Sequence, residues 1–207
     1  MNELSQFPVT FAILAITVLF SLVAFSSHEL KNKCLFYPYG MRSASEYYRF
    51  LSYGLIHADF MHLLFNMYTF YSFGRVAELY LFNKTEYILL YVTALVASSL
   101  FDFKKNRNNP RYAALGASGA VSAVLFSTII ISPWTSDIGI FGIFIPNILF
   151  ALIYLFYCYY MDKRGRDNIG HSAHLWGAIY GFAFAALVRQ DLFSAFLDKL
   201  IHPPFLK

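Results

Sequence analysis

The sequence has few charged residues. Only 14% of its 207 residues are Asp, Glu, Lys or Arg, whereas a soluble domain carries roughly 25%. Hydrophobic residues make up 58% and are spread along the whole chain. This composition excludes an ordinary soluble domain and predicts a protein that crosses a membrane several times. The length is that of one domain, which we expect to cover residues 1–207.

Cysteines and ligand motifs are also scarce. The only cysteines, Cys34 and Cys158, have no metal-ligand spacing, and His28-Glu29 lacks the second histidine of a zinc protease motif. Two isolated thiols are the simplest interpretation, and a disulfide between them stays open. The net charge of +4 comes without a Lys/Arg patch interleaved with aromatic residues. We therefore expect no cofactor, no metal and no nucleic-acid partner.

Six apolar segments are long enough, or nearly long enough, to cross a bilayer as helices. No basic residue precedes the first segment, so we expect it to be retained and not cleaved as a signal. A polar, aromatic-rich connection covers residues 26–53, and its amphipathic end, residues 47–51, is suited to the headgroup layer. The predicted fold class is all-α, a polytopic bundle of six transmembrane helices. The segments are residues 8–25, 59–73 (with Asp59 as N-cap), 85–101, 117–131, 138–160 and 171–189.

Polar residues interrupt the second, fourth and sixth segments, which run in the same direction. Asn66 lies about 10 Å into the second helix, and His174 lies about 9 Å beyond Asn168, the expected cap of the sixth. Ser118 reaches the same depth if the fourth helix starts below the membrane surface. The small residues Gly116-Ala117 permit this, because loop backbone is tolerated at depth where it lines a watery cavity. The sequence therefore predicts that these polar side chains lie at one level.

These residue types together indicate hydrolase chemistry. A serine hydroxyl is a weak nucleophile until a base takes its proton, and histidine is the usual base. Acyl transfer also needs donors directed at the developing oxyanion. Asn66 offers an amide, His62 an imidazole N–H, and the start of the fourth helix its backbone N–H groups. His57 and His171 either take a direct part in this chemistry or only form a hydrogen bond to water or to a neighbouring carbonyl, and both alternatives stay open.

Small residues indicate which helices pack closely. Gly177 and Gly181 form a G-x-x-x-G pattern on the sixth helix, a pattern typical of close helix contacts in lipid. Gly177 follows His174 by less than one turn, so both lie on one face. The fourth helix offers small residues in return, namely Gly119, Ala120, Ser122 and Ala123. We expect these two helices to approach closely enough for an imidazole to reach a serine.

The three stretches resemble the motifs of the rhomboid intramembrane serine proteases. The resemblance covers nearly the whole chain in the minimal six-helix form, and Tyr48-Arg49 resembles the Trp-Arg pair of that family's first loop. In chain order the motifs are His62-x-x-x-Asn66, Gly116-x-Ser118-Gly119 and Ala173-His174-x-x-Gly177-x-x-x-Gly181.

The resemblance implies a Ser118–His174 dyad with no acidic third member. It implies cleavage, through an acyl-enzyme, of a peptide bond in or near a transmembrane segment of a substrate in the lipid bilayer. It also implies that the fifth helix and the following loop gate access, with Gly142 and Pro146 softening that helix.

Two positions depart from the family pattern. Many members carry an aromatic residue four positions after the nucleophile, beneath the base, and here this position is Ser122. Another group must then orient His174. Trp176 also replaces the small residue that many members have two positions after the base.

Membrane orientation is the point where two arguments conflict. Eleven of the 16 Lys and Arg residues lie on the face that bears the loops 26–53, 102–116 and 161–170. The positive-inside rule puts that face in the cytoplasm. Six-helix members of the family usually open the active site outward, and we follow them, expecting a bacterial inner-membrane protein with its site outside.

Two alternatives remain. A catalytically inactive rhomboid-like protein would bind client helices, but such proteins typically lack the serine or the histidine. A small transporter with a histidine proton relay would need ionisable residues along a through-path, whereas the polar residues here gather at one end. Arg49 and Glu78 are either solvated singly or paired to hold the first loop.

Overall fold

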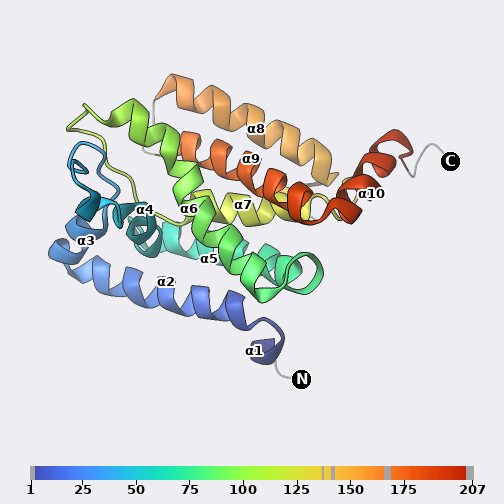
Figure 1. The fold of residues 1–207 in the computed structure, drawn as a ribbon, viewed down its shortest axis with the longest axis horizontal. Coiled ribbons are helices and arrows are strands. Elements are labelled where there is room, and N and C mark those ends of the chain that lie inside the picture. Colours follow the sequence, from blue (N-terminus) through green and yellow to red (C-terminus); the bar gives the residue numbers. More distant parts are fainter. Residues whose placement is uncertain (1–2, 137, 141–142, 166–168, 204–207) are drawn as a thin grey trace.

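The computed structural model describes residues 3–136, 138–140, 143–165 and 169–203, which are mainly helical (Figure 1). Shorter elements are the helical turns η1 Ala44–Glu46, η2 Tyr53–Leu55 and η3 Ala77–Leu81, and the strands β1 Ile138–Ile140 and β2 Ile143–Ile145. The α-helices are α1 Glu3–Gln6, α2 Pro8–Ser26, α3 His28–Cys34, α4 Arg49–Ser52, α5 Phe60–Val76, α6 Lys84–Asn106, α7 Ser118–Thr128, α8 Asn147–Arg164, α9 His171–Val188 and α10 Gln190–Ile201.

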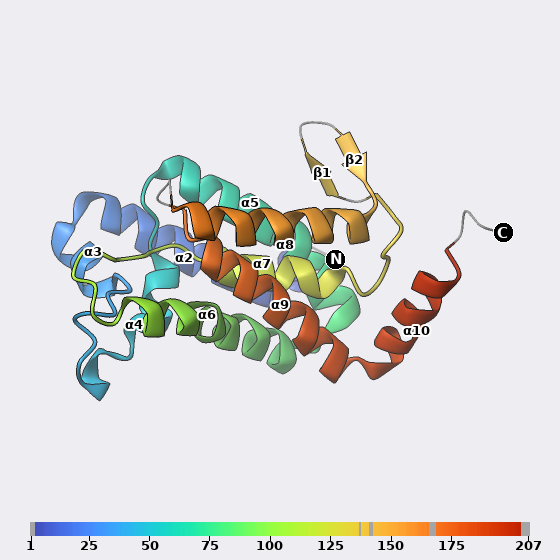
Figure 2. The same ribbon diagram turned by 90° about the horizontal axis from the view of Figure 1, so that it is seen from above.

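Helix α7 is the centre of the bundle. It packs most extensively against α9 and also against α5 and α6, while α8 packs on α9 and α2 on α5 (Figure 2). Every residue of α7 from Gly119 to Thr128 is buried. With 11 residues it is only about 16 Å long. The site residue Ser118 is its first residue, so the rest of the fold positions the start of this helix.

Two of the described helices are long and apolar enough to cross a membrane. They are Pro8–Ser26, with a mean hydropathy of 2.4, and Lys84–Asn106, with 1.4. Helix α7 is apolar but shorter than the roughly 20 residues that a span requires. The six spans expected from the sequence therefore stay a prediction.

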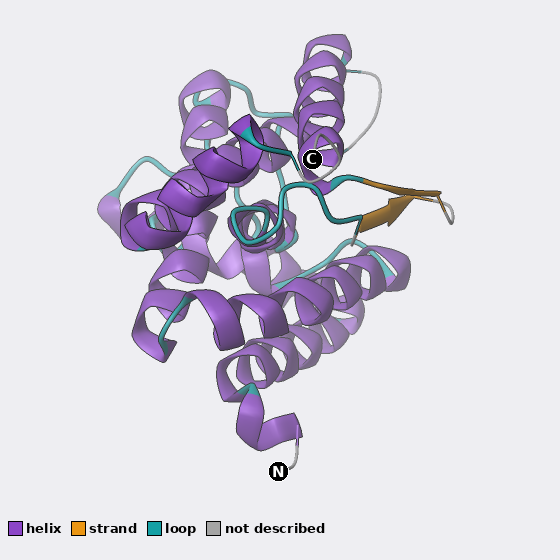
Figure 3. Cartoon of the chain, turned by 90° about the vertical axis from the view of Figure 1, so that its right-hand side faces the viewer, coloured by secondary structure: helices purple, strands orange, loops and turns teal. Residues whose placement is uncertain are grey.

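The segment 138–160, expected to be a helix interrupted by Gly142 and Pro146-Asn147, divides into a hairpin and a helix, so the expectation of a helix before Pro146 was wrong. Strands β1 and β2 pair antiparallel, with Ile138 opposite Ile145, and the hairpin stands out from the side of the bundle (Figure 3). Helix α8 begins only after Pro146. The residue before a proline avoids the helical region, and β-branched isoleucines favour strands. Pro146 therefore begins a helix and does not soften one, and Gly142 lies outside the described residues.

A partly buried carboxylate fixes the start of α2. Glu78, in η3, accepts hydrogen bonds from Val9 N at 2.9 Å, Thr10 N at 2.8 Å and Thr10 Oγ1 at 2.7 Å. The first N–H groups of a helix lack partners within the helix, and a negative charge suits this end of the dipole. Glu78 is therefore neither solvated singly nor paired with Arg49.

Arg49 has a separate role in the connection between α2 and α5. Its Nε lies 2.6 Å from Glu46 Oε2, and its Nη1 donates to the carbonyls of Asn32 and Leu35. The expected amphipathic end of this connection forms α4, with Phe50 buried beneath it. The guanidinium thus holds the connection together through one ion pair and two backbone carbonyls.

The two cysteines are free and buried, at different places in the fold. Cys34 ends α3 and Cys158 lies in α8. The interpretation as two isolated thiols is confirmed.

Glycines bring α7 and α9 into backbone contact. A Cβ added at Gly177 would meet the backbone of Gly119, and one added at Gly181 would meet the backbone of Ala123. Two of the four small residues expected to face α9 therefore do so. Ser122, expected at the same contact, instead bonds to a side chain of α8.

We expect Gly177→Ala and Gly181→Ala each to lower the melting temperature. The added methyl group meets backbone atoms, which cannot rotate away, and overpacking of this kind typically costs about 1–3 kcal/mol. The matched control is Gly170→Ala, where the added Cβ meets only Ala173 Cβ at 3.8 Å. Thermal unfolding in one detergent measures all three variants. Wild-type melting of Gly181→Ala would show that the two helices do not depend on this contact.

Candidate active site

A turn that requires glycine leads the chain to Ser118. Gly116 has φ of +113°, a conformation that residues with a side chain rarely adopt, and a Cβ there would lie 2.7 Å from His62 Cε1. Its backbone N–H donates to the carbonyl of Tyr53 at 2.9 Å. Helix α7 begins two residues later, at Ser118. Non-helical backbone thus leads into the interior of the bundle, as expected if the helix that begins at Ser118 starts below the membrane surface.

His57 holds this turn from the other side. Ser21 Oγ donates to the carbonyl of Leu55, so the bond of 2.9 Å between Ser21 Oγ and His57 Nδ1 takes its proton from the imidazole. His57 Nε2 then accepts from Ala117 N at 3.4 Å. These bonds describe a neutral, fully buried histidine that links α2 to the residue before Ser118. The sequence left the role of His57 open, and the structure places this residue beside the site.

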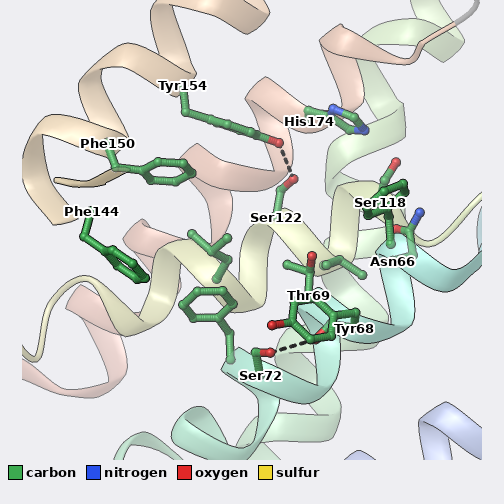
Figure 4. Close-up of a pocket in the computed structure, with 14 residues that line it drawn as sticks. Asn66, Tyr68, Thr69, Ser72, Ser118, Ser122, Phe144, Phe150, Tyr154 and His174 are labelled. Carbon is green, nitrogen blue, oxygen red and sulfur yellow. Dashed lines mark hydrogen bonds between the residues drawn. The ribbon is translucent and has the colours of Figure 1, made fainter. Parts of the chain in front are cut away.

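Three of the four expected site residues line one cavity of about 510 Å³. Asn66 comes from α5, Ser118 from α7 and His174 from α9. Figure 4 shows the Ser118 hydroxyl directed toward the His174 ring, with the Asn66 amide beside Ser118. Asn66 is buried, and its Nδ2 donates to the carbonyl of His62 at 2.9 Å. The structure thus brings the three side chains to one cavity, while their common depth in a membrane stays a prediction.

The fourth expected residue, His62, lies behind the turn. Among the described residues it is not part of the cavity lining. Its ring contacts Gly116 and lies edge-on to His57, with ring centroids 5.0 Å apart. Its backbone N–H donates to Asp59 Oδ1 at 2.8 Å, which bears out Asp59 as the N-cap. His62 therefore supports the backbone before Ser118 in this structure.

Tyr154 lies against His174 and was not found from the sequence. The two rings are stacked, with centroids 6.5 Å apart and an interplanar angle of 21°. The Tyr154 hydroxyl shares a hydrogen bond of 2.8 Å with Ser122 Oγ (Figure 4). An aromatic ring thus lies beside the imidazole, but it comes from α8. Ser122 was the available signal, since a small residue on α7 leaves space that a neighbouring helix must fill.

The arrangement has the parts that acyl transfer requires. Figure 4 places the Ser118 hydroxyl near an imidazole, which can act as a base, and near the Asn66 amide, which can donate a hydrogen bond. The first turn of α7 adds backbone N–H groups that have no partner within the helix. Donors fixed in advance around a developing negative charge lower the barrier without reorganisation.

Comparison with known proteins gives one family. A family model of the rhomboid domain matches residues 44–191, which include Asn66, Ser118 and His174. The rhomboid protease GlpG of Haemophilus influenzae is 28% identical over 151 residues, which cover 70% of this chain and 71% of that protein.

Two further relatives are longer than this chain. The rhomboid protease GluP of Bacillus subtilis is 25% identical over 181 residues, which cover 87% of this chain and 32% of that protein. Rhomboid-like protein 15 of Arabidopsis thaliana is 26% identical over 185 residues, which cover 81% of this chain and 43% of that protein.

We expect the Tyr154 ring to set the orientation of His174. In Tyr154→Ala the imidazole can rotate, and a misplacement of about 1 Å can cost on the order of 10² in rate. Modification of Ser118 by a fluorophosphonate, followed over time, should then slow about 10- to 100-fold. Tyr154→Phe keeps the ring and should stay within about threefold, because it loses only one hydrogen bond.

The control is Tyr159→Ala, which removes an exposed ring from the same helix. Wild-type reactivity in a folded Tyr154→Ala protein would show that the stacking does not orient His174.

Proposed function

Because the chain belongs to the rhomboid family, we propose that it is an intramembrane serine endopeptidase that acts through a Ser118–His174 dyad. The family is one of membrane-integral proteases, and two of the relatives above carry that activity in their names. The observation that carries the proposal is the meeting of Ser118, His174 and Asn66, from three helices, at one cavity.

In the proposed first step, Ser118 Oγ attacks the carbonyl carbon of a substrate peptide bond while His174 takes the hydroxyl proton. The oxyanion of the tetrahedral intermediate accepts hydrogen bonds from Asn66 and from N–H groups at the start of α7. The carbon–nitrogen bond then breaks, and His174 gives its proton to the leaving amine. His62 is proposed as a further donor that would have to turn from Gly116 toward the cavity.

In the second step, water attacks the acyl-enzyme ester at Ser118. His174 takes a proton from this water and returns it to the serine oxygen as the ester bond breaks. No cofactor or metal takes part in the proposed cycle. Two groups suffice because His174 can be oriented by the neighbouring Tyr154 ring and does not need an acidic residue.

The proposed setting is a single domain over residues 1–207 with six helices through a bacterial inner membrane. Its substrates are transmembrane segments of membrane proteins. Phe144 of the hairpin and Phe150 and Tyr154 of α8 border the cavity, and Phe144 is 64% exposed. This apolar side is suited to an unwinding substrate helix, so α8 and the hairpin are the proposed gate.

The alternatives are weaker. An inactive client-binding protein would not need a serine and a histidine at one cavity, and a proton-relay transporter would not gather its polar groups there.

Ser118→Ala should abolish cleavage of a transmembrane substrate, with a loss of at least about 10³ in rate, because the nucleophile is gone. The matched control is Ser127→Ala, which removes a hydroxyl bonded to the carbonyl of Val124 on the same helix. Cleavage is measured in liposomes, with the melting temperature of each variant beside it. A Ser118→Ala rate within tenfold of wild type would overturn the serine mechanism.

Single cysteines can test the proposed outward site. Cys34 is only 8% exposed and is a poor target, so both native cysteines are changed to Ser and a new one is placed at Ala44 or Thr85, which are exposed. Ala44 lies in the loop on the proposed active face, and Thr85 lies at the opposite end of the bundle. An impermeant maleimide should label Ala44→Cys in intact cells and Thr85→Cys only after lysis. The reverse pattern would mean that the Lys/Arg bias decides the orientation.

A further inference from the structure

Three side chains that are good metal ligands converge between α8 and α9. They are Cys158 of α8 and His171 and His174 of α9, and their ligand atoms lie within 4.8 Å of one another. We propose that these residues form a binding site for a soft divalent cation such as Zn²⁺, and that a cation bound there inhibits the enzyme.

The fold brings these groups together through the packing of α8 on α9. His171 and His174 are separated by less than one helical turn, so both face α8, and their ring centroids lie 6.2 Å apart. Cys158 is 1% exposed and His171 is 4% exposed, whereas His174 also lines the cavity. A cation can therefore reach the site from the cavity through His174.

The donor set selects the kind of ion. One thiolate and two imidazoles are ligands that Zn²⁺ accepts, with a Zn–S distance of about 2.3 Å and Zn–N distances of about 2.0–2.1 Å. A tetrahedral ion with these bonds holds its ligand atoms about 3.5 Å apart. Side-chain rotations that move the ligand atoms by about 1 Å are therefore enough to bring them to this spacing. Binding releases the proton of the Cys158 thiol. Hard cations such as Mg²⁺ prefer oxygen ligands and should not bind.

Inhibition follows from the place of His174 in both sites. As a metal ligand, the neutral imidazole gives its one free lone pair to the cation and carries its own proton on the other nitrogen, so no nitrogen is left to take the Ser118 proton. It is also held by the ion in the orientation that suits the metal. This consequence rests on the proposed protease function, whereas the binding of the ion does not.

Binding is tested without activity, in the Ser118→Ala protein. Titration with Co²⁺ should produce a thiolate-to-cobalt charge-transfer band in the near ultraviolet, and excess Zn²⁺ should abolish it. The band should disappear in Ser118→Ala/Cys158→Ser and remain in Ser118→Ala/Cys34→Ser, where the other buried thiol is removed. No band, or a band that survives the loss of Cys158, would overturn the site.

Inhibition is tested by the cleavage rates of the wild-type enzyme and of three variants that keep Ser118. The rate of each protein with added cation is compared with the rate of the same protein in the presence of a chelator. Zn²⁺ should inhibit cleavage reversibly, and Mg²⁺ should not. Cys158→Ser and His171→Gln should each raise the half-inhibiting Zn²⁺ concentration at least tenfold, while Cys34→Ser should leave it unchanged. Equal inhibition of all variants would overturn the regulatory part of the proposal. A cobalt band in a protein that cleaves no substrate would instead contradict the proposed function and leave the metal site supported.

Discussion

The contact between the backbones of α7 and α9 is the constraint on which the site depends. Gly177 faces Gly119, and Gly181 faces Ala123, so no side chain separates the two helices. We expect this contact to set the distance between Ser118 and His174, because each lies within a turn of it. Helices in lipid gain little from hydrophobic burial against each other, so close packing of small residues has to hold them. The same residues therefore serve stability and the geometry of the proposed dyad.

The second constraint is the turn before Ser118. A helix as short as α7 must begin inside the bundle, and its preceding backbone groups need partners there. The carbonyl of Tyr53 and the Nε2 of His57 supply two of them. His57 is in turn held by Ser21 of α2. The position of Ser118 thus depends on α2 and on the connection from α2 to α5, although no described residue of either lines the cavity.

Most of the helices and the meeting of Ser118, His174 and Asn66 could be predicted, because caps, breakers and small residues are local signals. Contacts of α8 could not be predicted. A helix that is apolar on nearly every side has no periodicity to show which face it turns inward, so the sequence of α8 does not show that Tyr154 and Cys158 face α9, and the small Ser122 on α7 is the one indirect signal. The hairpin was missed because a run of isoleucines is also typical of a membrane helix, and the apolar character of the segment was weighted above the strand preference of its residues. The carboxylate of Glu78 at the start of α2 joins segments 68 residues apart, beyond any sequence pattern.

Helix α8 connects these observations. Tyr154 lies against His174, and Cys158, one turn further along the same helix, has its sulfur within 4.8 Å of a nitrogen of the same imidazole. A displacement of α8 that opened the cavity to a substrate helix would also withdraw the ring that orients His174. Catalysis then requires α8 to return after the substrate is bound, and a cation shared between Cys158 and α9 would hold the two helices together. The residue that replaces the expected aromatic on α7, Ser122, is what transfers this control to α8, since its hydroxyl anchors Tyr154.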